Sequence, residues 1–175
     1  NQLKKMTGIK SVTTVIKYFS YLEAAYLLFK IPYFSYSLKR QMANPFKVFA
    51  IDNGLRNSVS FRFSSDTGRL FENIIAVELK RKNKEIYYWK NAQHEEVDFV
   101  INDNKVQQLM QVCYDITDTN VRKRELKALL KASKELRCSN LFVITHDYEA
   151  EEKVKGKIVR FVPMWKWLLT GKKLT

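Results

Sequence analysis

Apolar residues recur at helical spacing in three parts of the chain. The first run follows Ser11, a good helix N-cap, and should end at Pro32, which cannot continue a helix. A second stripe predicts a helix from Gly68 to about Lys82, and a third stripe predicts one from about Val121 to Leu136. A final helical turn is expected from Met164 to Leu169.

Apolar runs that alternate or are continuous predict strands elsewhere. Before position 52 these are Tyr33 to Ser37 and Phe46 to Ile51, joined by a polar connection. After it they are Glu85 to Lys90, Glu96 to Ile101, Lys105 to Tyr114, Leu141 to Thr145 and Ile158 to Pro163. A helix followed by a basic hairpin is typical of half a winged helix, so residues 1–52 are predicted to be a partial winged-helix segment. Residues 53–175 are predicted to form an α/β domain, with a mixed sheet flanked by helices.

Acidic residues gather on the strand that begins at Glu96. Alternate residues of a strand share a face, so Glu96 and Asp98 should point one way and Val97 and Phe99 the other. Carboxylates on one face of a strand are the ligands that a hard divalent cation needs.

The next strand brings further polar side chains to the same place. If the polar turn closes around Asn104 and Lys105, Asp98 lies opposite Gln111 and Glu96 lies opposite Cys113. Oxygen donors in this arrangement suit Mg²⁺ or Mn²⁺. The predicted metal contacts are therefore Asp98, Glu96 and Gln111.

Two sets of motifs resemble known families. Glu72 on a helix, Glu96-Val97-Asp98 on a strand and Gln111-Val112-Cys113 on the next strand resemble the PD-(D/E)xK nuclease superfamily. Four longer segments resemble the C-terminal domain of archaeal and bacterial AAA-type ATPases: Lys47 to Leu55, Gly68 to Asn73, Ile86 to Lys90 and Glu96 to Ile101. The resemblance implies a restriction-endonuclease-like fold, an ATPase domain upstream as partner, and catalytic roles for Glu72, Glu96, Asp98 and Gln111.

One position departs from the nuclease pattern. Cys113 stands where the motif has a lysine, and a thiol cannot supply the positive charge that stabilises a phosphoryl transition state. A cation from elsewhere would have to compensate, and the candidates are Arg122, Arg124, Lys127, Lys80 and Lys90. We therefore expect a degenerate nuclease fold that binds nucleic acid or a protein. The alternative is a Mg²⁺- or Mn²⁺-dependent DNA endonuclease.

The charge is strongly basic, with a net value of +13. Residues 1–70 hold eleven Lys or Arg against three acids. An excess of this size favours an anionic partner, most simply DNA, with predicted contacts at Lys17, Lys39, Arg40 and Lys47. The alternatives are a lysine-rich composition that serves solubility, and a winged helix that serves protein packing.

Several classes of protein are excluded or disfavoured by the sequence. There is no GxxxxGK[ST] loop, so no ATP site is expected within these residues. Two distant cysteines make neither a zinc quartet nor a disulfide framework, which favours the cytoplasm. The longest apolar stretch, Tyr18 to Ile31, is too polar and short for a membrane span. Because the first residue is Asn1, we expect a piece of a longer protein.

Overall fold

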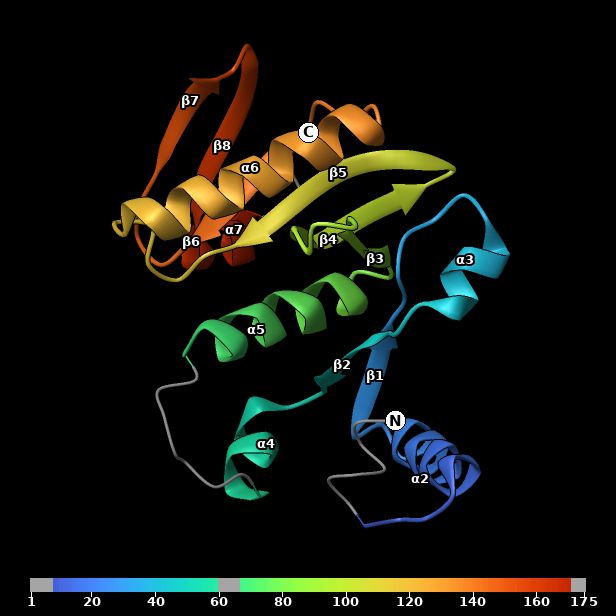
Figure 1. Ribbon diagram of the computed structural model, residues 1–175. Coiled ribbons are helices and arrows are strands. Elements are labelled where there is room, and N and C mark those ends of the chain that lie inside the picture. The colour runs from blue at the N-terminus through green and yellow to red at the C-terminus, as the bar shows by residue number, and fades with distance from the viewer. Residues whose placement is uncertain (1–7, 60–66, 171–175) are drawn as a thin grey trace.

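The computed structural model describes residues 8–59 and 67–170, and the predictions that fall on other residues lie outside it. A six-stranded mixed sheet with helices on both faces dominates the structure (Figure 1). Its strands are β3 (Glu85–Lys90), β4 (Glu96–Asp103), β5 (Lys105–Val112), β6 (Leu141–Thr145), β7 (Ala150–Val154) and β8 (Lys157–Pro163). Strand order is β3-β4-β5-β6-β8-β7. β5, β6 and β8 are parallel, and the other neighbouring pairs are antiparallel.

The helices of this part are α5 (Thr67–Arg81), α6 (Thr119–Glu135) and α7 (Met164–Thr170). The mixed sheet flanked by helices is thus confirmed, and the predicted elements after residue 67 match within a few residues at their ends. β7 was not predicted, because its sequence, Ala-Glu-Glu-Lys-Val, carries charges at the edge of the sheet.

Each face of the sheet has its own core. Residues of α6 such as Leu129 pack with Val97, Val100 and Leu109 on one face. Apolar side chains of α5, including Ile75, pack on the other face in a second cluster whose sheet members include Phe99, Met110, Phe142 and Ile144. The two faces therefore carry different sets of alternate strand residues, as the pleat requires.

The N-terminal part contains α2 (Val12–Ala24), β1 (Leu28–Ile31), α3 (Leu38–Ala43), β2 (Lys47–Ala50) and α4 (Asn53–Val59). β1 and β2 form a separate antiparallel pair. The predicted second strand of the hairpin is confirmed as β2, and a helix followed by two antiparallel strands is present. The assignment of this segment to a winged helix stays a prediction.

The prediction that the first helix continues to Pro32 is wrong. The helix ends at Ala24, and Tyr26 then takes a positive φ of 54°, which turns the chain. The following residues are a strand, in which Phe29 and Ile31 are buried on one face. An apolar run of this length fits the period of a helix as well as that of a strand. Burial against α5 favours the strand.

The prediction of a strand from Tyr33 to Ser37 is also wrong. Tyr33 makes an isolated parallel bridge to Tyr88 of β3. Ser37 is the N-cap of α3, and its carbonyl accepts a hydrogen bond from Gln41 N, so the segment expected to connect two strands contains a helix. The aromatic residues of this segment alternate as in a strand, but only Tyr33 pairs with the large sheet, at its edge strand β3.

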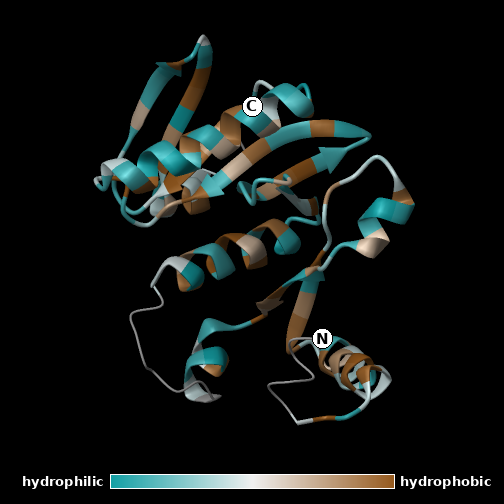
Figure 2. Ribbon diagram, in the orientation of Figure 1, coloured by the Kyte–Doolittle hydropathy of each residue, from teal (hydrophilic) through white to brown (hydrophobic). Residues whose placement is uncertain are grey.

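β1 and β2 contribute to the core beneath α5. Phe29, Ile31 and Phe49 belong to the same apolar cluster as the buried face of α5. Because alternate residues of β2 share a face, Lys47 points to the same side as Phe49, towards the large sheet. By contrast, α2 has no buried residue, and Ile16 and Tyr21 are more than 60% exposed on it. The helix nevertheless carries hydrophobic residues along its length (Figure 2).

Candidate functional site

A β-bulge in β4 determines the direction in which the Asp98 side chain points. The pairing of β3 with β4 shifts between Tyr87, opposite Val100, and Trp89, opposite Val97, so that Asp98 and Phe99 together face Tyr88. Both bulge side chains lie on the α5 side, where Phe99 packs in the core and Asp98 reaches Lys47. The prediction that Phe99 points away from Asp98 is therefore wrong.

The hairpin turn differs slightly from the prediction but preserves the expected register. The turn closes around Asn104 alone, at φ 58°, with Asp103 opposite Lys105. An extra residue, Gln107, then restores the register that pairs Phe99 with Met110. Asp98 consequently lies opposite Gln111, as predicted, but the prediction that their side chains share one patch is wrong, because the Gln111 side chain meets the backbone of Asp98 from the α6 side and not its carboxylate.

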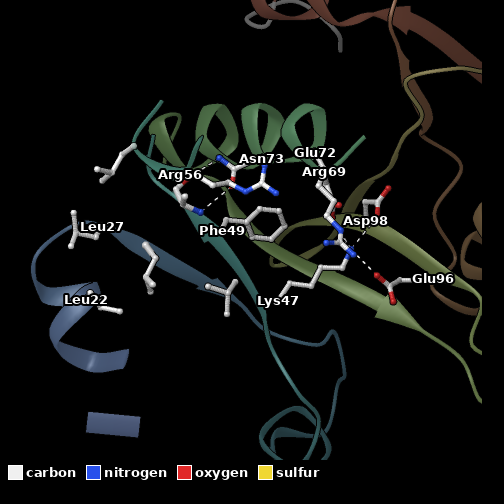
Figure 3. Close-up of a pocket in the computed structure, with 14 residues that line it drawn as sticks. Leu22, Leu27, Lys47, Phe49, Arg56, Arg69, Glu72, Asn73, Glu96 and Asp98 are labelled. Carbon is white, nitrogen blue, oxygen red and sulfur yellow. Dashed lines mark hydrogen bonds and ion pairs between the residues drawn. The ribbon is translucent and has the colours of Figure 1, made fainter. Parts of the chain in front are cut away.

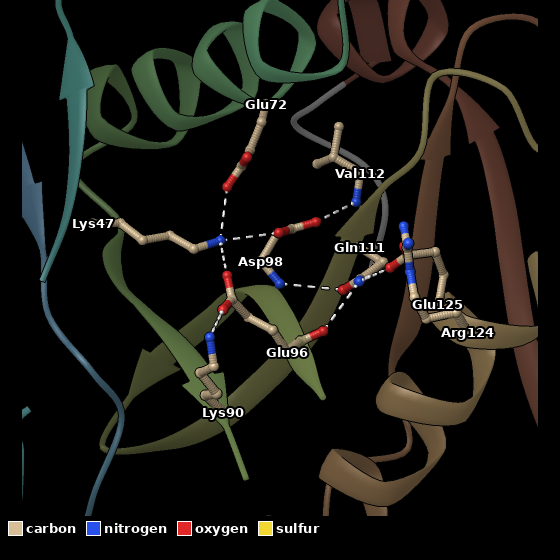
Figure 4. A network of polar contacts seen from close by, with 9 residues as sticks. All are labelled: Lys47, Glu72, Lys90, Glu96, Asp98, Gln111, Val112, Arg124 and Glu125. Atoms are coloured by element: carbon tan, nitrogen blue, oxygen red, sulfur yellow. Dashed lines mark hydrogen bonds and ion pairs between the residues drawn. The ribbon is translucent and has the colours of Figure 1, made fainter. Parts of the chain in front are cut away.

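Lys47 lies at the centre of the acidic residues (Figure 4). Its Nζ is 2.8 Å from Glu72 Oε1, 2.7 Å from Glu96 Oε1 and 3.0 Å from Asp98 Oδ1. We call these three acids and Lys47 the carboxylate cluster. Its members come from β2, α5 and β4, so the cluster ties the N-terminal strand pair to the large sheet.

The cluster shifts the protonation of its own members. Burial opposes the charged form of Lys47, but Asp98, Glu72 and Glu96 outweigh burial and raise the pKa of this amine. Burial, with the charge of Asp98, raises the pKa of Glu72 from 4.5 to about 7, although Lys47 acts against this. Burial also disfavours ionisation of Glu96, yet Lys47 and Lys90 hold its pKa below the usual range.

The side chain of Gln111 lies on the α6 side of the sheet and forms hydrogen bonds to the backbone of β4. Its Oε1 accepts the Asp98 N–H at 3.2 Å, and its Nε2 donates to Glu96 O at 3.1 Å and to Glu125 of α6. The second oxygen of the Asp98 carboxylate accepts the Val112 N–H at 3.0 Å. These bonds fix the bulge and use the polar atoms of Gln111.

Cys113 does not share the patch, contrary to the prediction. It lies in the core beneath α6, and its Sγ donates to Asp115 O. Burial, with smaller effects of Glu125 and Asp115, raises the pKa of the thiol to about 11. The thiol is therefore protonated at neutral pH and replaces no ammonium group.

The cations that the sequence suggested as compensation are mostly paired elsewhere. Arg122 binds Glu152, Arg124 binds Glu125, and Lys127 binds Glu95. Lys80 is exposed in the last turn of α5. Lys90 does reach the cluster, at 2.9 Å from Glu96 Oε2.

Sequence reasoning assigned Lys47 to nucleic-acid contact and missed its place in this site. A signal was available, because Lys47 shares a strand face with the apolar Phe49 and Ile51, and a lysine on a core face needs acidic partners. The other predicted nucleic-acid contacts, Lys17 on α2 and Lys39 and Arg40 on α3, are exposed.

The arrangement does not fit Mg²⁺ or Mn²⁺ as it stands. One oxygen of each of the three acids already contacts the Lys47 ammonium, which lies where a shared metal ion would lie. Asp98 Oδ2 and Gln111 Oε1 are engaged by backbone N–H groups. Among residues 8–59 and 67–170, no group of three His, Cys, Asp or Glu side chains has the geometry of a metal site.

The cluster separates two hollows of the surface. A cavity of about 760 Å³ lies on the side of β2 and α2 (Figure 3). A cleft of about 620 Å³ lies on the side of α6, where Gln111, Arg124 and Glu125 join its lining. Glu72, Glu96 and Asp98 line both.

The raised pKa of Glu72 predicts a pH dependence of stability. Between the unfolded value of 4.5 and the folded value of about 7, the folded state binds the proton that the unfolded state has released. Compared with a Glu72→Gln variant, the wild type should lose about 1–3 kcal/mol of unfolding free energy as pH rises through this window, and no more above it. Urea unfolding at several pH values measures this difference. Parallel pH profiles of the two proteins would contradict the assignment.

Comparison with known proteins places the chain in a family. Residues 67–167 match the family described as Domain of unknown function (DUF4143), and residues 1–66 match Domain of unknown function (DUF8612). The boundary between the two matches therefore falls at the start of α5. No solved structure matches the chain.

Two curated relatives are similar over most of the chain. Uncharacterized protein MJ1544 of Methanocaldococcus jannaschii is 38% identical over 97% of the chain and 39% of its own length. An uncharacterized protein of Haemophilus influenzae is 25% identical over 87% of the chain and 36% of its own length. The chain thus spans less than two fifths of these relatives. No described helix is long and apolar enough to cross a membrane. The chain belongs to the DUF4143 family, a domain found at the C-termini of AAA-ATPase-like proteins.

Proposed function

We propose that the chain is the C-terminal binding domain of an AAA-type ATPase, with a nuclease-like carboxylate site that its own lysine has closed. The observation that carries this proposal is the position of Lys47 Nζ, within 3.0 Å of an oxygen of each of Glu72, Glu96 and Asp98. A fixed internal cation offsets part of the negative charge of the acids without a metal ion. The domain then serves the ATPase by holding a nucleic acid or a protein.

The surroundings of the cluster support a binding role. The charge of Lys47 is held firmly, because three carboxylates raise its pKa. Gln111 is bonded to the backbone of β4 and to Glu125, so it offers no free carbonyl oxygen to a ligand. The positions of a nuclease motif are thus present, but they stabilise the junction of β2, α5 and β4.

A combined cleavage and retardation assay tests this function. The chain is incubated with linear, single-stranded and branched DNA in Mg²⁺ or Mn²⁺, beside an Asp98→Ala variant. We expect no cleavage that depends on Asp98, because the acid is committed to Lys47 and to Val112 N. Cleavage that the variant loses would contradict the proposal. Retardation without cleavage would assign the binding role to DNA, and its absence would leave a protein partner.

A metal-dependent DNA endonuclease is the second candidate. It is favoured by the 3.0 Å contact of Lys47 with Asp98, which supplies from β2 the ammonium group that the motif lacks at Cys113. This function requires Lys47 to withdraw from at least one carboxylate when a divalent cation arrives. In the assay above, it predicts cleavage that both Asp98→Ala and Lys47→Ala abolish.

A further inference from the structure

The outer edge of β2 carries backbone groups that face away from β1. In an antiparallel pair, every second residue of a strand forms hydrogen bonds to its neighbour. Ile51 N donates to Leu27 O, and this bond shows which residues of β2 face β1. Lys47 and Phe49, which lie four and two residues before Ile51, therefore also bond to β1. The N–H and C=O groups of Val48 and Ala50 point outward instead.

At Ala50, the side chain of Asn73 occupies the place that a neighbouring strand would take. Asn73 of α5 is buried, and its Nδ2 donates to Ala50 O at 2.8 Å while its Oδ1 accepts from Ala50 N at 2.9 Å. This pair of bonds is the pattern that a strand peptide would offer. At Val48, which is 45% exposed, no described residue satisfies the outward N–H and C=O.

The cavity of about 760 Å³ runs along this edge (Figure 3). Its lining includes Val48 and Ala50 from one face of β2 and Lys47 and Phe49 from the other. Since alternate residues of a strand point to opposite faces, a cavity that touches both sets must follow the strand edge.

The lining of this cavity distinguishes between classes of ligand. Leu22 from α2, Leu27 from the turn before β1 and Leu55 from α4 give the cavity apolar walls. Its three acids, Glu72, Glu96 and Asp98, are balanced in formal charge by Lys47, Arg56 and Arg69, so the lining as a whole offers no excess positive charge to a phosphate backbone. An unpaired strand edge with apolar walls suits a polypeptide better than a nucleic acid.

We propose that this cavity binds an extended polypeptide segment of a partner protein, which adds to the outer edge of β2 at Val48 and places apolar side chains against Leu22, Leu27 and Leu55. The inference rests on the proposed binding function and names its partner class. Main-chain hydrogen bonds to Val48 supply part of the affinity, and the apolar walls select alternate side chains of the segment. The segment continues along β2 from the place that Asn73 occupies.

The test uses the 175-residue chain and a fluorescent octapeptide of alternating valine and threonine, acetylated and amidated at its ends. Binding is followed by anisotropy, and the amide exchange of Val48 is followed by NMR. We expect binding, with slower exchange at Val48. A Val48→Pro variant removes the outward N–H and fixes φ, a change that an edge strand tolerates, and should weaken binding about tenfold. Val48→Thr keeps the backbone donor and the side-chain shape, and should change affinity much less.

A second probe avoids any change to the protein. The same peptide N-methylated at alternate residues cannot form the strand ladder, so it should bind the wild type at least about tenfold more weakly. Absence of binding at about 1 mM peptide, or equal affinity for the methylated peptide, would overturn the inference. Displacement of the peptide by a single-stranded oligonucleotide, with the same loss in Val48→Pro, would overturn it in favour of nucleic acid. These failures are distinct from that of the proposed function, which is decided by Asp98-dependent cleavage.

Discussion

Replacing Lys47 with methionine should lower the unfolding free energy by about 2–4 kcal/mol at pH 7. The methionine retains most of the apolar stem, but Glu72, Glu96 and Asp98 lose the ammonium that contacts all three. The charges of Glu96 and Asp98 then stand close together in a site where the lysine side chain is only 20% exposed, and Glu72, whose pKa rises further without Lys47, takes up a proton. Urea unfolding with a linear extrapolation measures the loss.

Two controls separate charge from packing in this variant. Lys47→Arg keeps the positive charge and should retain more stability than Lys47→Met. Acid pH supplies the second control. Protonation of the uncompensated acids should reduce the difference in unfolding free energy between Lys47→Met and the wild type. A Lys47→Met variant as stable as the wild type at pH 7 would contradict the account.

Replacing Asn73 with alanine should cost a comparable amount, about 2–4 kcal/mol. The substitution removes both hydrogen bonds that the Asn73 side chain makes to the N–H and the C=O of Ala50, and it leaves a gap beside the core under α5. Because Ala50 lies on the same strand as Lys47, the loss should also loosen the carboxylate cluster. Urea unfolding measures the first effect, and carboxyl NMR titration of Glu72 measures the second.

Asn53→Ala provides a matched control for this prediction. Among the described residues, the Asn53 side chain makes one hydrogen bond, from Nδ2 to Leu70 O at 3.2 Å, so its loss should cost less than that of Asn73. Equal losses in the two variants would show that Asn73 has no special role in holding β2.

Most of the sheet could be predicted from the sequence because its strands have one dominant period. β6, Leu141–Thr145, is apolar at every residue but the last and buried at every position. The meeting of Asp98 with Gln111 could also be predicted, since the register set by the hairpin brings them together. The helix and strand before residue 52 could not be separated, because the apolar run that ends at Ile31 fits either period.

The centre of the site was less accessible to sequence reasoning. Lys47 lies 25 residues from Glu72 and 51 from Asp98 along the chain, so no local spacing joins them. The bulge at Asp98 is equally hidden, because it depends on how β3 pairs with β4. Charge pattern alone favoured an exposed, nucleic-acid-binding lysine, whereas tertiary packing against α5 turned it inward.

The most direct measurement is a calorimetric titration of Mn²⁺ into the wild type, Asp98→Asn, Lys47→Met, and a Lys47→Met/Asp98→Asn double variant. If Lys47 holds the position of the cation, the wild type should show no binding at millimolar Mn²⁺. Lys47→Met should bind the ion through the released carboxylates, and the double variant should lose most of that binding. Binding of Mn²⁺ by the wild type that Asp98→Asn removes would contradict the claim that its own lysine closes this site.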